Sequence, residues 1–390
     1  MAKPLSKTVV VAYGRSAVAK SGKKGALRNL HPIDMGGLVL KGVMEKIPKL
    51  DPALVEDVIL GCAIPEAKQG LNPARLVAAR AGLPYTACGL TVDRFCSSSL
   101  QAVALAAWQI EAGQADCIVA GGIESMTALP MTLDRSGDMD PWLLEHDPAQ
   151  YISNGETAEN VAEKYNVTRE EMDRLALESH RKAAAAQAAG RFDAQMIPVT
   201  VPGKRGKTTV VDRDECVRPE STMETLGRLP TAFEPDGVCT AGNSSPMSDG
   251  AGAVVLMDRE TAEKKGLEPL AVFRGFAVTG CDPSIMGVGP VEAIRKVLRK
   301  TGLTLEEMDL IELNEAFATQ SIACIRELGL DMDKVNVNGG ALALGHPLAG
   351  TGAILTAKLL YELKRRRARY GLVAFCMAGG QGGAAVFERI

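Results

Sequence analysis

A single cysteine stands where a short apolar run gives way to a helical pattern. The segment TVDRFCSSSLQAVALAAWQIEAG spans residues 91–113, and Cys96 lies at the first turn of its helical part. A helix N-terminus favours a thiolate, which is the nucleophilic form of cysteine. Free cysteine is also among the residue types most often buried as packing. The pattern leaves two interpretations of Cys96 open, a nucleophile and a space-filling residue.

Three further motifs lie at predicted junctions of a strand with a helix or a turn. They are NEAF with Asn314, GHPLAG with His346 and CMAGGQGG with Cys376. Ligands of open α/β sheets bind outside the carboxyl ends of strands, where all four motifs are expected. The chain has only four histidines, which makes His346 a prominent candidate for the base that a cysteine nucleophile needs. The alternative for His346 and for Cys376 is a buried core residue.

The elements that must position these motifs alternate at both ends of the chain. Residues Leu100, Val103, Ala104, Ala107 and Ile110 follow helical spacing after Cys96. Alternating strands and helices predict βαβ units and a mostly parallel sheet. Short apolar runs predict strands at 8–13, 55–62, 88–92, 116–122, 250–258, 271–278 and at the VNVN that begins at Val335. Residues 308–317 are predicted to be a strand that breaks into a helix, and 371–388 a strand, a turn and a strand.

The middle of the chain departs from this alternation. Residues 123–244 hold Ala-rich amphipathic helices and few strands, which predicts an insertion carried on the first domain. The predicted domains are one half formed by 1–122 with 245–268, the insertion, and a second half at 269–390. The second half repeats the element order of the first, including the tripeptide AGG after the motif-bearing helix. Packed face to face, such halves would bring two helix N-termini to one cleft.

Composition excludes several function classes. The chain has 390 residues, 46% hydrophobic and 23% charged, with a net charge of −3, and nothing in this balance indicates nucleic acid or a membrane surface. The basic run at 364–367 is interpreted as a solvated helix end. No stretch approaches the ~20 apolar residues of a membrane span, and no signal peptide is found, so a cytoplasmic location is expected.

The cysteines indicate free thiols in a reducing compartment. There are nine, and no C-x-x-C pair occurs among them, so neither a zinc site nor a redox pair is predicted. No metal is expected. The seven cysteines outside the motifs are interpreted as packing residues: Cys62, Cys88, Cys117, Cys216, Cys239, Cys281 and Cys324.

Taken together, the motifs resemble the thiolase family, and the resemblance covers the whole chain. It extends to GCAIPEAKQGLNPAR (61–75), GGIESMT (121–127), TAENVAEKY (157–165), AGNSSPMSDGAG (241–252) and DPSIMGVGP (282–290). The resemblance implies an α/β fold of two βαβαβαββ halves in five α-β-α-β-α layers, with an inserted loop domain. It also implies a homodimer or homotetramer that transfers acyl groups between coenzyme A (CoA) thiols. CoA is then a co-substrate, and no permanently bound cofactor is implied.

The chemistry implied by the resemblance is thiolysis of a 3-ketoacyl-CoA between C2 and C3. Cys96 would attack the keto carbon and carry the acyl group as a thioester. His346 would activate Cys96 and donate to an oxyanion at another step, and Cys376 would exchange a proton with the acetyl-CoA enolate. Asn314 would hold a water in one oxyanion site. The backbone N–H groups of Cys96 and Ala378 would form a second oxyanion site.

The resemblance is less firm about CoA contacts. It places the nucleotide and pantetheine on the loop domain, with Ser245 against the pantetheine and Arg218 on the adenine side. Met286 would line the acyl pocket. The alternatives are a surface arginine for Arg218 and a plain core residue for Met286.

The chain departs from the family pattern near the nucleophile. Ser99 and Ala378 stand where glycine is more common, Asp93 replaces an asparagine, and GHPLAG replaces GHPLGA. Ser99 is expected either to crowd the acyl group or to donate a hydrogen bond. Asp93 is expected to disfavour the thiolate. These changes bear on rate and chain-length preference and leave the reaction class unchanged.

The favoured function is that of a 3-ketoacyl-CoA thiolase (acetyl-CoA C-acyltransferase) of fatty-acid β-oxidation. Ser153-Asn154-Gly155 stands where members that condense two acetyl-CoA units commonly carry a longer stretch with His-Met-Gly. The first alternative is such an acetoacetyl-CoA thiolase (acetyl-CoA C-acetyltransferase). The second is a thiolase-fold protein that binds acyl-CoA or lipid with little turnover. The third is a cysteine hydrolase, against which the set of four motifs argues.

Overall fold

The computed structural model describes residues 7–129 and 136–390, and its centre is a ten-stranded mixed sheet. The strands predicted from the sequence are confirmed, with shifted ends, except the one at VNVN (335–338), where Val335 makes only an isolated bridge. A two-residue strand, β2 (Ala19–Lys20), pairs with β8 beside the main order. The main strands are β1 (Thr8–Arg15), β3 (Asp57–Gly61), β4 (Leu90–Val92), β5 (Cys117–Ser125), β8 (Ser248–Asp258), β9 (Ala271–Gly280), β10 (Leu310–Leu313), β11 (Tyr370–Met377) and β12 (Gln381–Arg389).

The pairing order confirms the internal duplication. The first half has the order β1-β8-β5-β3-β4 and the second has β9-β12-β11-β10. In each half a parallel pair, β3 with β5 or β10 with β11, is followed by two antiparallel pairs. The prediction of a mostly parallel sheet is wrong, because three of the described strand pairs in this sheet are parallel and six are antiparallel. The two halves are joined where Val9 and Val10 of β1 pair with Val272 and Ala271 of β9. The AGG tripeptides are not equivalent, because 120–122 lies inside β5 and 378–380 follows β11.

The second half is one strand short of the predicted βαβαβαββ unit. Where the first half has β4, the second has only an isolated bridge between Ile311 and Val335. The outer edge of β10 is nevertheless closed. Ile311 exchanges backbone hydrogen bonds with the 334–336 segment at 2.9 Å, and the buried Asn336 side chain bonds both N–H and C=O of Leu313 at 3.0 and 2.8 Å.

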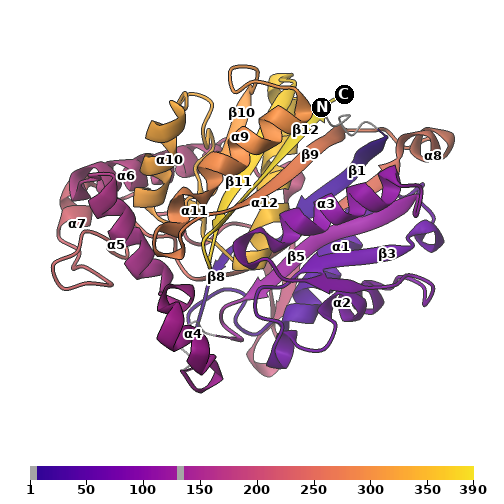
Figure 1. Ribbon diagram of the computed structural model, residues 1–390. Helices are drawn as coiled ribbons and strands as arrows, with labels where there is room; N and C mark the ends of the chain where they lie inside the picture. The colour runs from indigo at the N-terminus through magenta and orange to yellow at the C-terminus, as the bar shows by residue number, and fades with distance from the viewer. Residues whose placement is uncertain (1–6, 130–135) are drawn as a thin grey trace.

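Helices cover both faces of each half-sheet and fill the space between them (Figure 1). Pro290 lies in the first turn of α9, where its missing N–H costs nothing. The helices of the two halves are α1 (Pro32–Glu45), α2 (Pro73–Ala81), α3 (Ser98–Glu111), α8 (Arg259–Lys264), α9 (Gly289–Thr301), α10 (Ala318–Leu328), α11 (Ala341–Leu344) and α12 (Thr351–Arg366). Short 3-10 turns precede the two central helices: η3 (Phe95–Ser97) before α3 and η9 (Leu348–Gly350) before α12.

Side-chain alternation along the strands explains the layers. Val9 of β1 packs in a core with α1 and α2, whereas Val10 packs in a second core that contains α3 and α12. A third core lies under α9 and α10, on the outer face of the second half. Strands buried on both faces need apolar residues at nearly every position, as these sequences have. The three cores confirm the predicted α-β-α-β-α order.

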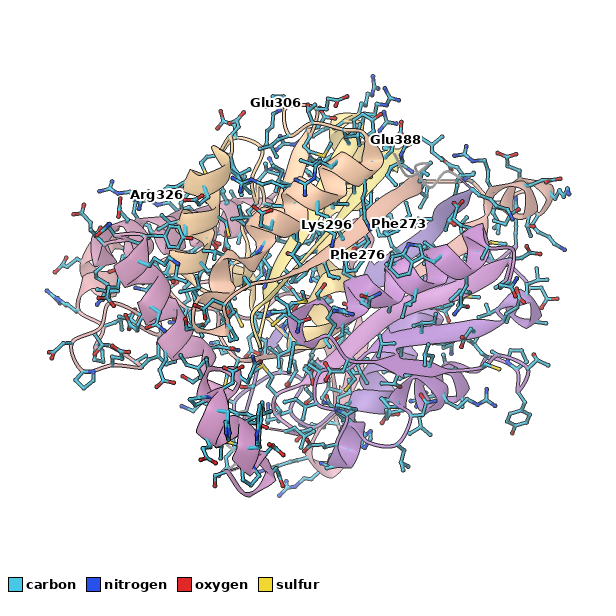
Figure 2. The ribbon with its side chains drawn as sticks, viewed as in Figure 1. Phe273, Phe276, Lys296, Glu306, Arg326 and Glu388 are labelled. Atoms are coloured by element: carbon cyan, nitrogen blue, oxygen red, sulfur yellow. The ribbon has the colours of Figure 1, made fainter. Side chains whose placement is uncertain are left out.

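Aromatic residues of β9 pack beside the central layer. Phe273 meets Phe387 edge to face with centroids 5.3 Å apart, and Phe276 lies 6.2 Å from Trp108 of α3. Figure 2 shows Phe273 and Phe276 on β9 next to that helix. The contact between Phe276 and Trp108 joins the second half to a helix of the first, whereas Phe273 and Phe387 pack within the second half.

The N-termini of α3 and α12 meet in the central layer. The buried Ser99 hydroxyl accepts a hydrogen bond from the Ala353 N–H at 2.9 Å. A Cβ at Gly352 would lie 2.5 Å from the Leu100 nitrogen, so only glycine permits this approach. The hydrogen bond expected at Ser99 therefore exists, but Ser99 accepts it and its partner is the other half of the chain.

The insertion between β5 and β8 is mainly helical and lies to the left in Figure 1. The capping box Ser153–Glu156 starts α5, which gives the Ser153-Asn154-Gly155 stretch a local role as a helix start. A Cβ at Gly155 would collide with the Phe233 ring at 2.1 Å. The insertion contains α4 (Pro141–His146), α5 (Asn154–Lys164), α6 (Arg169–Ala188), α7 (Met223–Gly227) and the hairpin of β6 (Val199–Pro202) and β7 (Thr208–Val211).

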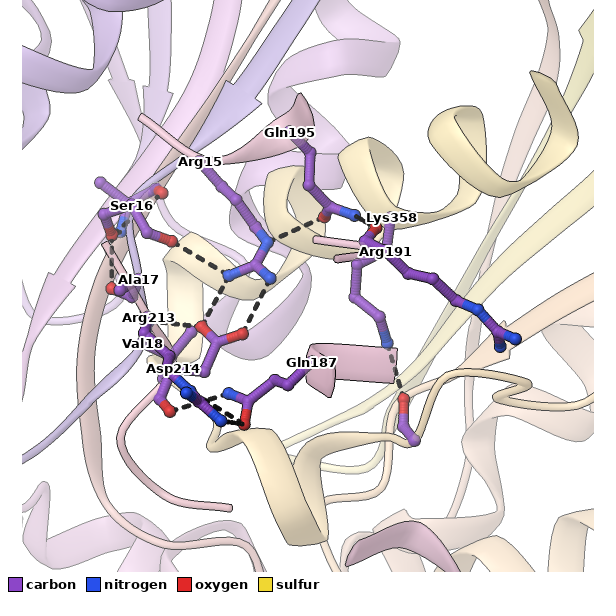
Figure 3. A network of polar contacts seen from close by, with 12 residues as sticks. Arg15, Ser16, Ala17, Val18, Gln187, Arg191, Gln195, Arg213, Asp214 and Lys358 are labelled. Atoms are coloured by element: carbon purple, nitrogen blue, oxygen red, sulfur yellow. Dashed lines mark hydrogen bonds and ion pairs between the residues drawn. The ribbon is translucent and has the colours of Figure 1, made fainter. Parts of the chain in front are cut away.

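A buried ion pair ties the insertion to β1 (Figure 3). The Arg15 guanidinium donates to both oxygens of Asp214 at 2.7 and 2.9 Å, and its Nε donates to Gln195 at 2.9 Å. Asp214 also accepts from the Val18 N–H at 2.8 Å. Both charged side chains are at most 1% exposed. A buried pair with its hydrogen bonds satisfied fixes the segment after β7 against the first half.

No helix in residues 7–129 or 136–390 is long and apolar enough to cross a membrane. The basic run ends α12, and Arg365 and Arg366 both pair with Glu362 one turn earlier. This confirms the interpretation of the run as a helix end.

Removing Asp214 should destabilise the protein more than removing the whole pair. Asp214→Leu leaves the Arg15 charge buried without a counter-ion, so we expect the free energy of unfolding to fall by about 3–5 kcal/mol. The double variant Arg15→Met/Asp214→Leu should recover most of that loss. Urea denaturation followed by circular dichroism measures both. Equal losses in the single and double variants would contradict the charge explanation.

Candidate active site

Cys96 lies in the η3 turn at the start of α3, in a backbone that its neighbours hold under strain. Phe95 has φ of +46°, which is unusual for a bulky residue. The Ser98 hydroxyl accepts from the Arg94 N–H at 2.8 Å and donates to the Phe95 carbonyl at 2.6 Å. The Asp93 carboxylate accepts from the Phe95 N–H at 2.7 Å. These bonds present the thiol at the helix N-terminus.

Burial outweighs the helix terminus in setting the state of Cys96. The residue is 5% exposed, and burial raises the pKa of its thiol to about 12. The backbone N–H at residue 96 lowers this pKa, and the carboxylates of Glu124 and Asp93 raise it. The expected effect of Asp93 is present, while the expected net stabilisation of a thiolate is not. Cys96 is therefore a thiol at neutral pH and needs a base to react.

His346 precedes η9 and is held as a neutral imidazole. Burial lowers its pKa to about 4. Its Nδ1 lies 2.7 Å from the Thr351 hydroxyl, and its Nε2 lies 3.4 Å from the Asn314 amide nitrogen. With the proton on Nδ1 donated to Thr351, Nε2 carries a lone pair and accepts from Asn314. An imidazole in this tautomer can take a proton at Nε2.

Asn314 follows β10 directly and has a free acceptor. Its backbone N–H donates to the Ala374 carbonyl of β11 at 2.9 Å, which fixes the residue at the strand end. The side-chain oxygen is buried and has no hydrogen-bond partner in the described part of the chain. A buried amide oxygen of this kind suits a water with further partners. The water-holding role of Asn314 stays a prediction.

Cys376, near the end of β11, packs against Met286 and Ala316. Burial raises the pKa of its thiol well above the usual range, and the next contribution comes from Cys96. The two sulfurs are thus close enough for their negative charges to disfavour each other. The η3 turn packs against both β11 and η9. The fold brings the first half's Cys96 to Cys376 and to the His346 loop of the second half.

The turn after Cys376 is tied to the segment that carries Cys96. Gly379 and Gly380 adopt φ of +69° and +73°, which requires glycine. The Gln381 amide donates to the Ala378 carbonyl at 3.4 Å and accepts from the Arg94 guanidinium at 3.2 Å. The turn that contains Ala378 is therefore fixed by Arg94, which lies two residues before Cys96.

The predicted CoA contacts divide into two groups. The Ser245 N–H donates to the Ala316 carbonyl at 2.9 Å, so Ser245 joins Met286 beside Cys376. Arg218 is exposed on the segment after β7, and its backbone N–H donates to His180 of α6 at 3.2 Å. The structure brings Ser245 and Met286 to the two thiols, whereas the contact of Arg218 lies within the insertion.

Sequence reasoning missed several residues around these groups. Thr351 and Ser248 hold His346, the latter by accepting from its backbone N–H at 3.2 Å. A hydroxyl in the first turn after GHP is the signal that points to Thr351. The packing interpretation is wrong for Cys88, which is exposed, while Cys281 is half-buried. Within residues 7–129 and 136–390, no cluster of three His, Cys, Asp or Glu residues is arranged to hold a metal.

Comparison with known proteins settles the family. Residues 8–260 match the family described as "Thiolase, N-terminal domain", and residues 267–389 match "Thiolase, C-terminal domain". The chain belongs to the thiolase family. This thiolase is 48% identical to the 3-ketoacyl-CoA thiolase of Bacillus subtilis, over 98% of this chain and 100% of that protein. It is an acyltransferase by family.

Two solved structures support the same assignment. The acetyl-CoA acetyltransferase of Bacillus anthracis superposes with a TM-score of 0.92 at 42% identity, over 100% of both chains. The human mitochondrial 3-ketoacyl-CoA thiolase in complex with CoA superposes with a TM-score of 0.90 at 37% identity, again over 100% of both chains. The duplicated fold predicted from the sequence is thereby confirmed.

The raised pKa of Cys96 predicts how its alkylation depends on pH. Because the thiolate is the reactive form, the rate of reaction with iodoacetamide should rise about tenfold per pH unit from 7 to 9 without a plateau. Mass spectrometry of the Cys96 peptide measures the rate, and exposed Cys88 in the same digest controls for reagent activity. A rate that is constant over this range would show a thiolate already formed at pH 7.

Proposed function

We propose that this thiolase cleaves 3-ketoacyl-CoA with CoA, giving acetyl-CoA and a shortened acyl-CoA through an acyl thioester on Cys96. The supporting observation is the convergence of two buried thiols from opposite halves, Cys96 and Cys376, beside a neutral imidazole at His346. Carbon–carbon cleavage needs a nucleophile, a base and a second proton carrier. These three residues supply one group for each role.

The first half-reaction begins with proton transfer from Cys96 to Nε2 of His346. The thiolate attacks the 3-keto carbon, and the bond between C2 and C3 then breaks. The departing acetyl-CoA enolate takes a proton at C2 from Cys376. The acyl group remains on Cys96 as a thioester, and Cys376 is left as a thiolate.

The second half-reaction returns each proton to its origin. The Cys376 thiolate takes the proton of the incoming CoA thiol, and the CoA sulfur attacks the acyl thioester. Cys96 leaves as a thiolate and recovers its proton from the His346 imidazolium. Shortened acyl-CoA is released, and the enzyme is back in its starting state.

Two groups of donors would stabilise the negative oxygens of these steps. The backbone N–H groups of Cys96 and Ala378 face one oxyanion, and protonated His346 with a water held by Asn314 faces the other. Fixed donors of this kind are the strongest single contribution in acyl transfer. The unpaired Asn314 oxygen supports the water site.

CoA is proposed as a co-substrate, with no permanently bound cofactor. We assign its nucleotide to the insertion at 123–244, where Arg218 is exposed, and its pantetheine to the side of Ser245. Met286 would border the acyl chain, since it touches Cys376. The flanking halves are 1–122 with 245–268 and 269–390. The solved CoA complex of the human relative supports this ligand.

A homodimer or homotetramer in the cytoplasm completes the proposal. In the part of the chain that the structure describes, no strand pairs with the outer edge of β4, and apolar side chains stand exposed near it: Leu71 at 94%, Tyr85 at 93% and Leu90 at 40%. Unpaired edges with apolar neighbours favour pairing with another copy.

The intermediate can be trapped directly. Incubation with acetoacetyl-CoA in the absence of free CoA should add one acetyl group to the intact protein, with the modified peptide containing Cys96. Intact-mass and peptide mass spectrometry detect it, and Cys96→Ala should show no adduct. Tight acyl-CoA binding without an adduct or CoA-dependent cleavage would instead identify an acyl-CoA-binding protein, and release of free acid would identify a hydrolase.

Chain length separates the degradative enzyme from an acetoacetyl-CoA thiolase, which the Bacillus anthracis structure keeps as a second candidate. We expect kcat/KM for CoA-dependent cleavage to be at least as high for eight- to sixteen-carbon substrates as for acetoacetyl-CoA. The disappearance of each 3-ketoacyl-CoA, followed by liquid chromatography, measures cleavage across the series. Activity confined to the four-carbon substrate would favour the biosynthetic enzyme.

A further inference from the structure

One buried carboxylate near the thiols has no part in the proposed mechanism. Glu124, near the end of β5, is 1% exposed. One of its oxygens accepts from the backbone N–H groups of Ala63 at 2.9 Å and Ala349 at 3.2 Å, and the other accepts from the Gln69 amide at 2.7 Å. Ala63 and Gln69 belong to the first half, and Ala349 belongs to the second. Glu124 therefore joins the two halves by hydrogen bonds beside the site.

The link to the second half reaches the loop of His346. Ala349 is three residues beyond the imidazole in a tight turn, in which the Leu348 N–H donates to the His346 carbonyl at 2.9 Å. The backbone of β5 also touches this turn, since a Cβ at Gly122 would lie 2.5 Å from the Ala349 carbonyl oxygen. The position of η9 against β5 thus sets the position of His346.

The duplication gives this contact a counterpart on the catalytic side. Ala349 is the middle residue of η9 before α12, as Cys96 is the middle residue of η3 before α3. β5 packs against η9, and β11 packs against η3. The Cys96 N–H is the proposed donor to a substrate oxygen, whereas the Ala349 N–H donates to a Glu124 oxygen. In the second half, the Glu124 carboxylate accepts from the backbone N–H at the position where, in the first half, a substrate oxygen is proposed to accept.

The charge of Glu124 does not serve the thiolate. Ionised Glu124 raises the pKa of both Cys96 and Cys62, so it opposes the reactive form of the nucleophile. Its own pKa is raised to about 7 by burial, against the three hydrogen bonds, with a further rise from Asp93. Protonation would place an O–H donor among three N–H donors. Ionised Glu124 is costly to bury and disfavours the thiolate. We therefore explain its presence by the segments that its hydrogen bonds hold together.

We propose that Glu124 is a positioning residue for the thiolase reaction: its ionised carboxylate holds η9 against β5, fixing His346 relative to Cys96, and protonation releases this hold. The inference rests on the roles proposed above for Cys96 and His346. It predicts an acid limit that His346 alone would not give. A base with a pKa of about 4 stays competent well below neutrality, whereas the Glu124 carboxylate is lost as the pH falls through about 7.

The experiment compares Glu124→Gln, Glu124→Asp and the wild type in acetoacetyl-CoA cleavage between pH 5.5 and 9. In Glu124→Gln the amide keeps the volume but must present an NH₂ group to one of the N–H donors. We expect kcat to fall about 10- to 100-fold with KM within about twofold, and the decline below pH 7 to disappear. Glu124→Asp keeps the charge at a shorter reach, so kcat should fall while the acid decline remains.

Asp249→Asn is the matched control. Asp249 is a buried carboxylate on the neighbouring strand β8, and it accepts hydrogen bonds from Thr127, two residues after the end of β5. We expect this variant to lose thermal stability, with kcat within about twofold of wild type and an unchanged acid decline. A wild-type acid decline that persists in Glu124→Gln, or a wild-type kcat in that variant, would overturn the proposal.

The acyl-adduct measurement on the wild type separates this proposal from the proposed function. If the wild type forms the adduct on Cys96 and Glu124→Gln behaves as the wild type does, only the role of Glu124 fails. If the wild type forms no adduct, both fail. A normal amount of adduct that forms at least tenfold more slowly in Glu124→Gln supports a positioning role.

Discussion

The contact between the N-termini of α3 and α12 is the constraint on which the molecule depends. A glycine at 352 lets the two central helices approach backbone to backbone, and Ser99 joins them by a hydrogen bond. The two helices lie in the central layer between the half-sheets, so this contact sets the spacing of the halves. The groups that start the helices, Cys96 on one side and the His346 loop on the other, are brought together as a result.

The site this contact creates is buried, and burial decides its protonation states. Burial keeps Cys96 and Cys376 as thiols and His346 as a neutral base. Neutral partners avoid the cost of burying separated charges before substrate arrives. Charge then develops only during the reaction, where fixed donors can stabilise it. The helix ends and the His346 imidazole, which Thr351 holds, are therefore oriented in advance toward charges that form only during the reaction.

Much of this arrangement was predictable from the sequence. Apolar runs located the strands, and the family motifs located the residues that gather at the centre. Three kinds of feature were not predictable. The pKa of Cys96 depends on burial by distant segments, which outweighs the local effect of a helix terminus. The role of Ser99 depends on a partner 254 residues away. Glu124 lies within the GGIESMT motif, but only its contacts with Ala63, Gln69 and Ala349 show that it joins the two halves.

The two ends of the sheet differ in a way that bears on assembly. At β10 the chain itself satisfies the outer backbone groups, because Asn336 takes the place of a neighbouring strand. At β4, no strand of the described residues pairs with the outer edge. A molecule with matching open borders on both sides could add copies without limit and grow into a fibre. Because the second copy of the repeat lacks one strand, of the two described sheet edges only that of β4 is available to pair with another molecule. Growth through strand pairing therefore stops once two such edges have paired. The divergence of the repeats thus limits growth through strand pairing.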